Sequence, residues 1–317
     1  MCRSRSVTRI FASIGECMIE MSLTAEGLYR RGFAGDTLNT AWGVRGLTDP
    51  ARVGVRYVTR VGADASSGEM VRFIADAGID TGHIGREPDR PVGLYMIALQ
   101  NGERSFSYWR DTSAARRLAA DADVLQQALA DADSIYFSGI TLAILSPPHR
   151  QTLLDQLAEA RARGAMIAFD ANIRLNLWPD RAAARAALDA GYRVATLALP
   201  TFPDEADLFG DTSPEATARR LTGCGAEEIV VKNGADPCTL LVGERIETIA
   251  PVAVVDPLDT TGAGDSFNAG YIAARLDGAA PADAARFAHR VAARVIGRRG
   301  ALIDMAELRA GTGSGLT

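Results

Sequence analysis

The stretch Asp259-Thr-Thr-Gly-Ala-Gly-Asp265 stands between a β-rich run and a segment of helical period, Ser266–Leu276. A strand, a turn of small residues and a helix, in this order, bring the backbone amides of Gly262, Ala263 and Gly264 to a helix N-terminus. Free amides and the positive end of the helix dipole bind anions, and glycine lets a phosphate come close to the backbone. The stretch therefore predicts a site for an anion.

Asp265 closes this stretch. Its charge makes it unsuitable as a phosphate ligand, so we interpret it as a base. It would orient an acceptor hydroxyl and take its proton while a γ-phosphoryl group is transferred. The alternative is a flexible turn before a helix, in which Asp265 only complements the dipole. The stretch on its own leaves both interpretations open.

The composition excludes several classes of function. The chain has 317 residues, 47% of them hydrophobic, which is enough for one α/β domain with a full core. Its net charge of −5 argues against a nucleic-acid partner. Lys232 is the only lysine, so the chain has no Gly-Lys pair for a P-loop. The G-x-G-x-x-G pattern of dinucleotide sites fails at Phe267, which argues against an oxidoreductase of that type.

The four cysteines and three histidines are scattered, without C-x-x-C or H-E-x-x-H, so we expect no structural zinc site. Sparse thiols are typical of a reducing compartment. The sequence has no run of about 18 apolar residues and no apolar signal segment near its start. We therefore expect a cytoplasmic protein with no membrane partner.

Short β-rich runs alternate with longer amphipathic segments, which predicts an α/β fold with a mostly parallel sheet. The clearest predicted strands are Ile135–Ser138, Met166–Asp170, Val194–Leu199 and Ile229–Lys232. The clearest predicted helices are Ser146–Arg163, one that opens at Ser213-Pro214, and Pro281–Gly297. Serine and proline at a helix start, and glycine just after its end, are usual caps.

Residues 16–36 and 91–111 interrupt this alternation, since both are strand-like and lack a clear helical period. In the second segment, two β-rich runs flank Asn101-Gly102, which predicts a hairpin. We expect both segments to form a small β-lid across one edge of the main sheet, and its exposed face could join two copies of the chain. The predicted domain spans residues 8–310, and residues 311–317 are expected to be a flexible tail.

Asp259–Ala273 resembles, without a gap, the C-terminal signature of the ribokinase-like (PfkB-type) carbohydrate kinases. A second signature of that family, a Gly-rich turn followed by Asn, is similar to Ala34-Gly-Asp-Thr-Leu-Asn-Thr-Ala41. Ala34 stands where the family usually has glycine. The likeness runs from about Ile10 to Ile303. It implies an ATP-dependent kinase with a ribokinase-like three-layer α/β sandwich and a small β-sheet lid.

The resemblance also implies roles for residues in these motifs. Sugar hydroxyls would bind to Gly35, Asp36 and Asn39. The anion hole and the base would be formed by Gly262, Ala263, Gly264 and Asp265. In Val231-Lys-Asn-Gly234, Lys232 and Gly234 would flank ATP. The alternative for Lys232 is an ordinary solvated end of a strand.

ATP and Mg²⁺ are the expected cofactors, because the phosphates of ATP bring Mg²⁺ with them. The family often carries Asn-x-x-Glu, which organises Mg²⁺ through waters. The corresponding stretch here is Pro200-Thr-Phe-Pro-Asp-Glu205, in which Thr201 replaces the asparagine. The acid is Asp204 without a gap, or Glu205 with a shift of one residue.

Two arginines suggest that the sugar carries an acid group. Arg110 follows Tyr108 by two residues, and Arg174 ends the stretch Asp170-Ala-Asn-Ile-Arg174. A planar guanidinium is suited to bidentate binding of a carboxylate. The two-residue period of a strand puts Tyr108 and Arg110 on one face, with Tyr95 on the pairing strand. The alternative for each arginine is a surface side chain over an aromatic core edge.

Three strings resemble the 2-keto-3-deoxygluconate kinase branch of the family: Ile14–Glu20, Phe106–Ala115 and Asp170–Trp178. This resemblance implies transfer of the γ-phosphoryl group to the C6 hydroxyl of that sugar acid, with Asn172 among the substrate-binding residues. A fructokinase-like enzyme of the same fold stays open, as does a catalytically silent regulator that binds a sugar acid or a nucleotide. The intact Asp265 argues against the regulator, because a pure binder needs no base.

Overall fold

The computed structural model describes residues 8–24, 26–100, 103–254, 257–298 and 300–310. Within this part, nine strands form a large sheet in the order β13-β12-β11-β10-β9-β8-β1-β4-β5. Neighbours from β11 to β5 are parallel, and β12 and β13 add antiparallel strands at one edge. The strands are β1 (Arg9–Ile14), β4 (Val53–Gly62), β5 (Ile84–Glu87), β8 (Ser134–Ser138), β9 (Met166–Asp170), β10 (Leu197–Ala198), β11 (Glu228–Val231), β12 (Cys238–Val242) and β13 (Arg245–Ile249).

The two faces of the large sheet bury different cores, because side chains alternate along a strand. In β8, Ile135 and Phe137 pack in one core and Tyr136 in the other. The first core also holds residues of α3 (Ala122–Leu129), α4 (Gly139–Ile144), α5 (Pro147–Ala162), α6 (Arg181–Val194), α7 (Phe202–Phe209) and α8 (Pro214–Gly223). The second holds residues of α1 (Asp36–Leu47), α2 (Ala65–Asp76), α9 (Ala263–Asp277), α10 (Pro281–Ile296) and α11 (Met305–Ala310).

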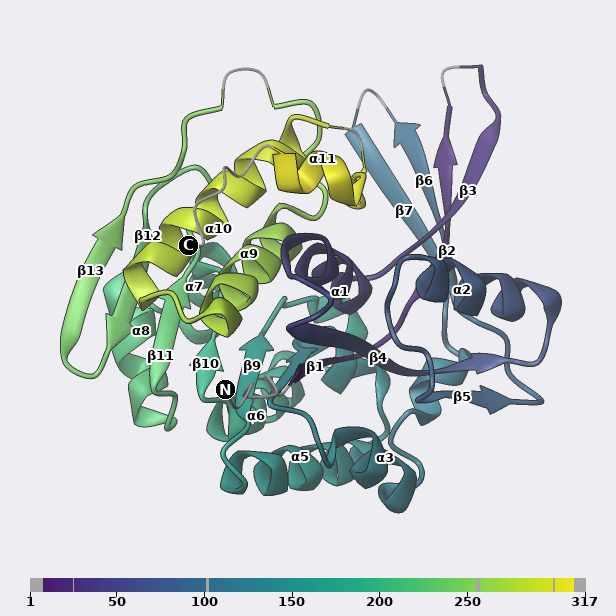
Figure 1. The fold of residues 1–317 in the computed structure, drawn as a ribbon, viewed down its shortest axis with the longest axis horizontal. Coiled ribbons are helices and arrows are strands. Elements are labelled where there is room, and N and C mark those ends of the chain that lie inside the picture. The colour runs from purple at the N-terminus through teal and green to yellow at the C-terminus, as the bar shows by residue number, and fades with distance from the viewer. Residues whose placement is uncertain (1–7, 25, 101–102, 255–256, 299, 311–317) are drawn as a thin grey trace, which may run out of the picture.

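This arrangement is a three-layer sandwich, with the sheet between two layers of helices. Figure 1 shows α3 and α5 together on one side of the sheet and α1, α9 and α10 on the other. The predicted α/β fold class with a mostly parallel sheet is confirmed.

A second, smaller sheet has four strands within the described residues, in the order β3-β2-β6-β7. They are β2 (Met18–Leu23), β3 (Tyr29–Ala34), β6 (Leu94–Gln100) and β7 (Glu103–Trp109). The hairpin predicted around residues 91–111 is the antiparallel pair of β6 and β7, and its turn, Asn101-Gly102, lies outside the described residues. Figure 1 shows this sheet projecting from the main body beside α1. The predicted tail, 311–317, also lies outside the described residues.

Caps in the sequence correctly located both ends of α5 and the start of α8. Ser146 accepts a hydrogen bond from the backbone N–H of His149 at the start of α5, and Gly164 follows that helix with a φ of 92°. Ser213 caps α8 through the backbone N–H of Ala216. The strand predicted at Val194–Leu199 is present as β10 but is shorter, because α6 extends through Val194 and Leu197–Ala198 pair with β9 and β11.

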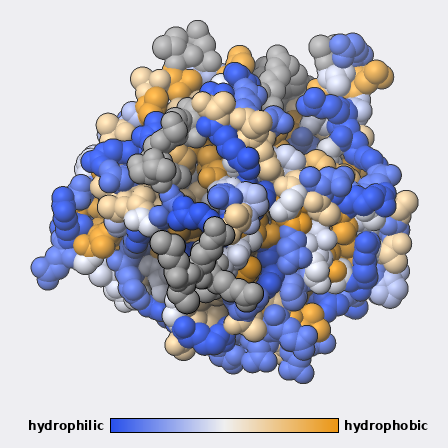
Figure 2. Space-filling view, in the orientation of Figure 1, coloured by the Kyte–Doolittle hydropathy of each residue, from blue (hydrophilic) through white to orange (hydrophobic). Residues whose placement is uncertain are grey.

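Hydrophilic residues cover most of the face shown in Figure 2, with hydrophobic ones scattered among them. Throughout the described ranges, no helix combines the length and the apolar content needed to cross a membrane. The apolar residues of the helices contribute instead to the two cores on either side of the large sheet.

Candidate active site

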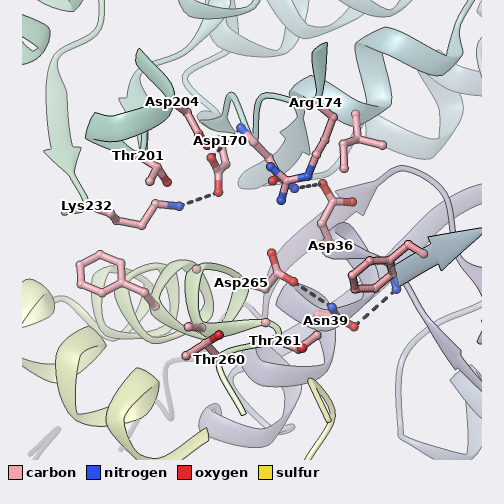
Figure 3. A pocket seen from close by; sticks show the side chains of 18 of the residues that line it. Asp36, Asn39, Asp170, Arg174, Thr201, Asp204, Lys232, Thr260, Thr261 and Asp265 are labelled. Atoms are coloured by element: carbon pink, nitrogen blue, oxygen red, sulfur yellow. Dashed lines mark hydrogen bonds and ion pairs between the residues drawn. The ribbon is translucent and has the colours of Figure 1, made fainter. Parts of the chain in front are cut away.

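A cleft of about 950 Å³ lies where the parallel strands end and the small sheet begins. The loops after β9 and β11, the first turns of α1 and α9, and strands β6 and β7 all contribute to its lining. Ligands of α/β sheets bind at the carboxyl ends of the strands. Every residue predicted for the site lines this cleft except Glu205. Figure 3 shows the side chains converging from its opposite walls.

The anion-binding turn enters a helix as predicted, but the strand predicted just before it is absent from the described residues 250–254 and 257–258, since β13 ends at Ile249. Helix α9 begins at Ala263, and Gly262 precedes it with a φ of 74°, in the left-handed region that favours glycine. The N–H of Ala263 donates to the carbonyl of Thr260 at 3.2 Å, which closes the turn. Gly264 lies in the first helical turn, where a backbone amide has no acceptor within the helix. Its amide is therefore a donor for an anion in the cleft.

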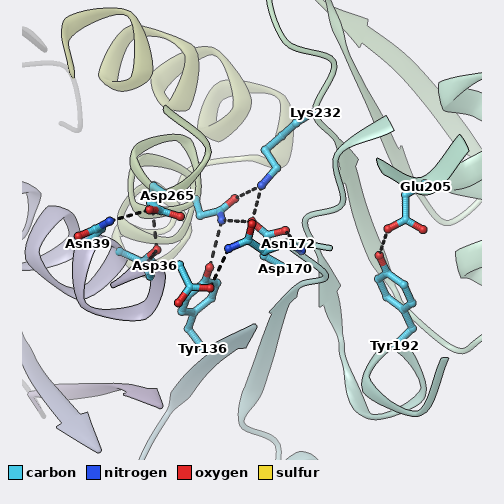
Figure 4. A network of polar contacts seen from close by, with 11 residues as sticks. Asp36, Asn39, Tyr136, Asp170, Asn172, Tyr192, Glu205, Lys232 and Asp265 are labelled. Atoms are coloured by element: carbon cyan, nitrogen blue, oxygen red, sulfur yellow. Dashed lines mark hydrogen bonds and ion pairs between the residues drawn. The ribbon is translucent and has the colours of Figure 1, made fainter. Parts of the chain in front are cut away.

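Asp265 lies in the same first turn and takes part in a contact between two helices. Its Oδ2 accepts a hydrogen bond of 2.8 Å from Nδ2 of Asn39, on α1 (Figure 4). Burial and the nearby Asp36 carboxylate raise the pKa of Asp265 to about 7, against the opposing effect of the Asn39 bond. A carboxylate with a raised pKa accepts a proton more readily than an ordinary aspartate. This environment favours the base over the simple helix cap.

The start of α1 lies beside Asp265 in the wall of the cleft. Oδ2 of Asp36 accepts a bond of 2.8 Å from Nδ2 of Asn172, which comes from the loop after β9. The backbone of Asn172 has a φ of 33°, and its N–H donates to Oδ1 of Asp170 at 2.9 Å. A non-glycine residue in this region is strained, and such strain is concentrated at functional sites. Asp36 is thus held in place from across the cleft.

Lys232 is buried, with 7% of its surface exposed, so its interpretation as a solvated strand end is wrong. Its Nζ donates to Oδ2 of Asp170 at 2.6 Å and to Oδ1 of Asn268 at 3.0 Å. A Cβ built on Gly264 would lie 3.6 Å from this Nζ, so the ammonium group lies beside the anion-binding turn. Asn268 was missed by the sequence reasoning, although it is a polar residue in a buried stretch of α9. Gly234, nearby in the lining, has a φ of 61°.

The two arginines proposed for a carboxylate differ in their surroundings. Arg110 is 8% exposed, so it is not a surface side chain, and its Nη2 is paired with Glu16, which sequence reasoning also missed. It follows the last residue of β7, and it lines the cleft together with Tyr108 and Tyr95, the neighbours predicted for it. Tyr95 and Tyr108 lie directly opposite each other in the hairpin, with ring centroids 5.8 Å apart. Arg174 is exposed and donates to the carbonyl of Ile173 at 2.9 Å.

Glu205 is not placed to serve Mg²⁺. Its side chain is fully buried on the far side of α7, where Oε1 accepts from the hydroxyl of Tyr192 and Oε2 from Nη2 of Arg220 at 2.6 Å. Figure 4 shows Glu205 and Tyr192 apart from the cluster around Asp170. Asp204, one residue earlier on the helix, lines the cleft. Of the two acids proposed, only Asp204 faces the site.

Residues 10–308 match the family described as pfkB family carbohydrate kinase. The chain belongs to the pfkB family of carbohydrate kinases. It is 40% identical over 304 residues to a 2-dehydro-3-deoxygluconokinase of Dickeya dadantii, with 94% of this chain and 98% of the relative covered. It is 39% identical over 303 residues to the protein of that name from Escherichia coli K12, with the same coverage.

Solved structures show the same fold. The structure of a PfkB protein from Polaromonas sp. JS666 superposes with a TM-score of 0.83 at 27% identity, covering 96% of this chain and 100% of that one. The chain is therefore a carbohydrate kinase, an enzyme that transfers a phosphoryl group to a carbohydrate.

The two neighbouring acids of α7 provide a paired test of this kinase. Asp204→Asn is expected to raise the Mg²⁺ concentration needed for half-maximal rate about tenfold, because residues that orient a metal's waters contribute this much to affinity. Glu205→Gln is expected to leave the Mg²⁺ dependence unchanged and to lower the free energy of unfolding by about 1–3 kcal/mol, since its partners are buried. Mg²⁺ titrations of the initial rate and denaturant unfolding measure both. A changed Mg²⁺ dependence in Glu205→Gln, together with an unchanged one in Asp204→Asn, would assign the Mg²⁺ role to Glu205.

The raised pKa of Asp265 predicts a pH dependence. The base must be deprotonated, and its pKa of about 7 lies above that of an ordinary aspartate. We expect kcat/KM to fall about tenfold per pH unit below pH 7 and to level off above it. Initial rates between pH 5 and 9, with Mg²⁺ in excess to keep the nucleotide ionised, check this expectation. A profile flat down to pH 5 would contradict it.

Gly35 is expected to accept no larger residue. A Cβ at this position would lie 2.2 Å from the backbone oxygen of Glu16. Gly35→Ala must push the start of α1 away from the link between β1 and β2, at a cost of about 1–3 kcal/mol in the free energy of unfolding. Gly32→Ala is the matched control, because a Cβ there meets nothing within 4 Å. Thermal unfolding of both variants provides the comparison, and equal Tm values would contradict the expected crowding.

Proposed function

We propose that this kinase transfers the γ-phosphoryl group of ATP to the C6 hydroxyl of 2-keto-3-deoxygluconate, giving 2-keto-3-deoxy-6-phosphogluconate. The observation that carries the proposal is the layout of the cleft. A base lies beside an anion-binding helix N-terminus, and Arg110 and Arg174 line the same cleft. The printed name of the relatives with 39–40% identity, 2-dehydro-3-deoxygluconokinase, supports the same substrate.

The reaction follows from the positions of the groups. The sugar hydroxyl lies between Asp265 and the γ-phosphoryl group, which the amides at the start of α9 bind. As the bond between this hydroxyl oxygen and phosphorus forms, the bond from phosphorus to ADP breaks, and the hydroxyl proton passes to Asp265. The ammonium group of Lys232, beside the same turn, offsets negative charge on the transferred group. ADP and the sugar phosphate then leave.

Mg²⁺ reaches such a site with the nucleotide. Within the described ranges, no three His, Cys, Asp or Glu side chains are grouped so that they could hold a metal ion, so the chain offers no closed metal cage. Among the acidic residues that line the cleft, Asp204 is the one proposed to serve Mg²⁺. A single carboxylate is enough for an ion that keeps most of its waters and is held chiefly by phosphates. When bound, Mg²⁺ neutralises charge on the phosphates of ATP. Solved pfkB-type structures include a ribokinase II from E. coli in complex with ATP and Mg²⁺.

The sugar acid is bound from both walls of the cleft. Asp36 and Asn39, with the backbone at Gly35, hold hydroxyl groups, and Arg110 and Arg174 hold the carboxylate. The rings of Tyr95 and Tyr108 line the hairpin side. An association of two copies through the small sheet and a cytoplasmic location remain predictions, which size-exclusion chromatography with light scattering and cell fractionation test.

A coupled ADP-release assay over a panel of sugars and sugar acids tests the proposal. We expect 2-keto-3-deoxygluconate to give the highest kcat/KM, because fructose leaves both arginines without an anion. Turnover of fructose without turnover of the sugar acid would favour the fructokinase-like alternative. ATP binding without any turnover would favour a silent regulator.

A further inference from the structure

The chain passes between the main body and the small sheet at four places, and all four meet at Glu16. This residue lies in the link from β1 to β2, and Gly35 lies in the link from β3 to α1. Gly93 precedes β6, and residues 110–113 follow β7. Glu16 is 2% exposed and lines the cleft, although it belongs neither to the anion-binding turn nor to the proposed carboxylate-binding residues.

Both the side chain and the backbone of Glu16 take part in these contacts. Its Oε2 accepts a hydrogen bond from Nη2 of Arg110, and its Oε1 accepts one from Oγ of Ser113. A Cβ on Gly35 would lie 2.2 Å from the carbonyl oxygen of Glu16, and one on Gly93 would lie 3.1 Å from its Oε1. The link at residues 110–113 is therefore tied to Glu16 by two hydrogen bonds, and the links at Gly35 and Gly93 approach it so closely that only glycine fits without a shift.

The pair that Glu16 forms with Arg110 is almost fully buried, with side-chain exposures of 1% and 7%. Removing one member of such a pair leaves the other charge buried without compensation. Glu16 uses one corner of the guanidinium, and the Nε of Arg110 is buried with no hydrogen-bond partner among the described residues. A guanidinium has five N–H donors in a fixed plane, so fixing one corner fixes the direction of the others.

The charge of Glu16 has a second consequence. It offsets the charge of Arg110, so that Arg110 acts on a carboxylate mainly through directed hydrogen bonds. The exposed Arg174 supplies a second positive charge within the same cleft. If Glu16 only repelled a carboxylate, its removal would tighten sugar-acid binding. If it positions Arg110, its removal weakens binding.

We propose that Glu16 is a positioning residue that holds Arg110 in the orientation in which it binds the carboxylate of the sugar acid. The inference rests on the proposed function, because it takes a sugar acid as the substrate. Glu16 then determines the affinity for the acid and leaves the phosphoryl-transfer step to Asp265. It acts through Arg110, and it ties the small sheet to the body at the same point.

A double-mutant cycle on Glu16→Ala and Arg110→Ala tests this role. Each single variant is expected to raise KM for 2-keto-3-deoxygluconate about tenfold or more, with kcat and KM for ATP changed by less than about threefold. In the Arg110→Ala background, Glu16→Ala should raise KM for the sugar acid by less than about twofold more, because the effects of residues that act as one unit are not additive. Glu16→Gln, which keeps the shape, serves in the same cycle where the alanine variant does not fold.

Glu87→Gln is the matched control. Glu87 is also buried and accepts two hydrogen bonds, from Arg60 at 2.5 Å and Arg117 at 3.1 Å, but it does not line the cleft. We expect it to lower Tm and leave both KM values unchanged. Three results would each overturn the inference. The effects of Glu16→Ala and Arg110→Ala on KM multiply, or Glu16→Ala leaves KM for the sugar acid constant or lowers it. The third is that Glu16→Ala, like Glu87→Gln, lowers Tm and changes neither KM. Absence of turnover of the acid by the wild-type enzyme would instead overturn the proposed function, and the inference with it.

Discussion

Replacing Asp265 by asparagine is expected to lower kcat by about 10²–10⁴-fold, the range that a positioned general base contributes. The amide cannot take the proton of the acceptor hydroxyl, while its shape still fits against Asn39, which bonds to Asp265 at 2.8 Å. Single-turnover rates at saturating ATP and sugar acid measure the chemical step directly.

The control for this variant is the affinity for ATP. The amides that bind phosphate belong to the backbone at the start of α9 and do not change, so the Kd of ATP should stay within about threefold. Thermal unfolding should show no loss of stability, because the substitution removes a charge from a partly buried site where Asp36 opposes it. Near-normal kcat would contradict the role of Asp265 as base.

Replacing Lys232 by methionine is expected to have the second-largest effect. Loss of a charge-stabilising donor beside the transferred group costs about 10²–10³-fold in kcat. The same change leaves the Asp170 carboxylate buried without its cation, which costs about 3–5 kcal/mol of folding stability. Steady-state kinetics and denaturant unfolding measure the two effects separately.

A second substitution distinguishes the chemical role of Lys232 from its structural one. Asp170→Asn in the Lys232→Met background removes the unpaired charge, and its amide can still bond to Asn268. Stability should largely return, and kcat should not. Recovery of kcat together with stability would show that Lys232 only neutralises Asp170.

The fold could be predicted from the sequence because its signals are local. Ser146 and Ser213 cap helices as their positions indicate, and the β-rich run Met166–Asp170 has the bounds of β9. The error at Val194 also has a local cause. Its β-branched side chain favours a strand, but α6 buries one face against the first core, and this packing extends the helix to Val194.

The site was predicted only where a motif names its residues. Lys232 and Asp170 lie 62 positions apart, and Arg110 and Glu16 lie 94 apart, so no local pattern pairs them. The first pair forms where β9 and β11 end at one edge of the large sheet, and the second forms where the links between the two sheets meet. The choice between Asp204 and Glu205 likewise depends on which side of α7 faces the cleft, which the short and irregular stretch before the helix does not determine.

The position of the phosphate on the product tests the central claim most directly. Phosphorus and proton NMR of the product of ATP and 2-keto-3-deoxygluconate are expected to show the phosphorus coupled to the protons on C6. Phosphate at any other carbon, or release of ADP without a phosphorylated sugar acid, would contradict the account.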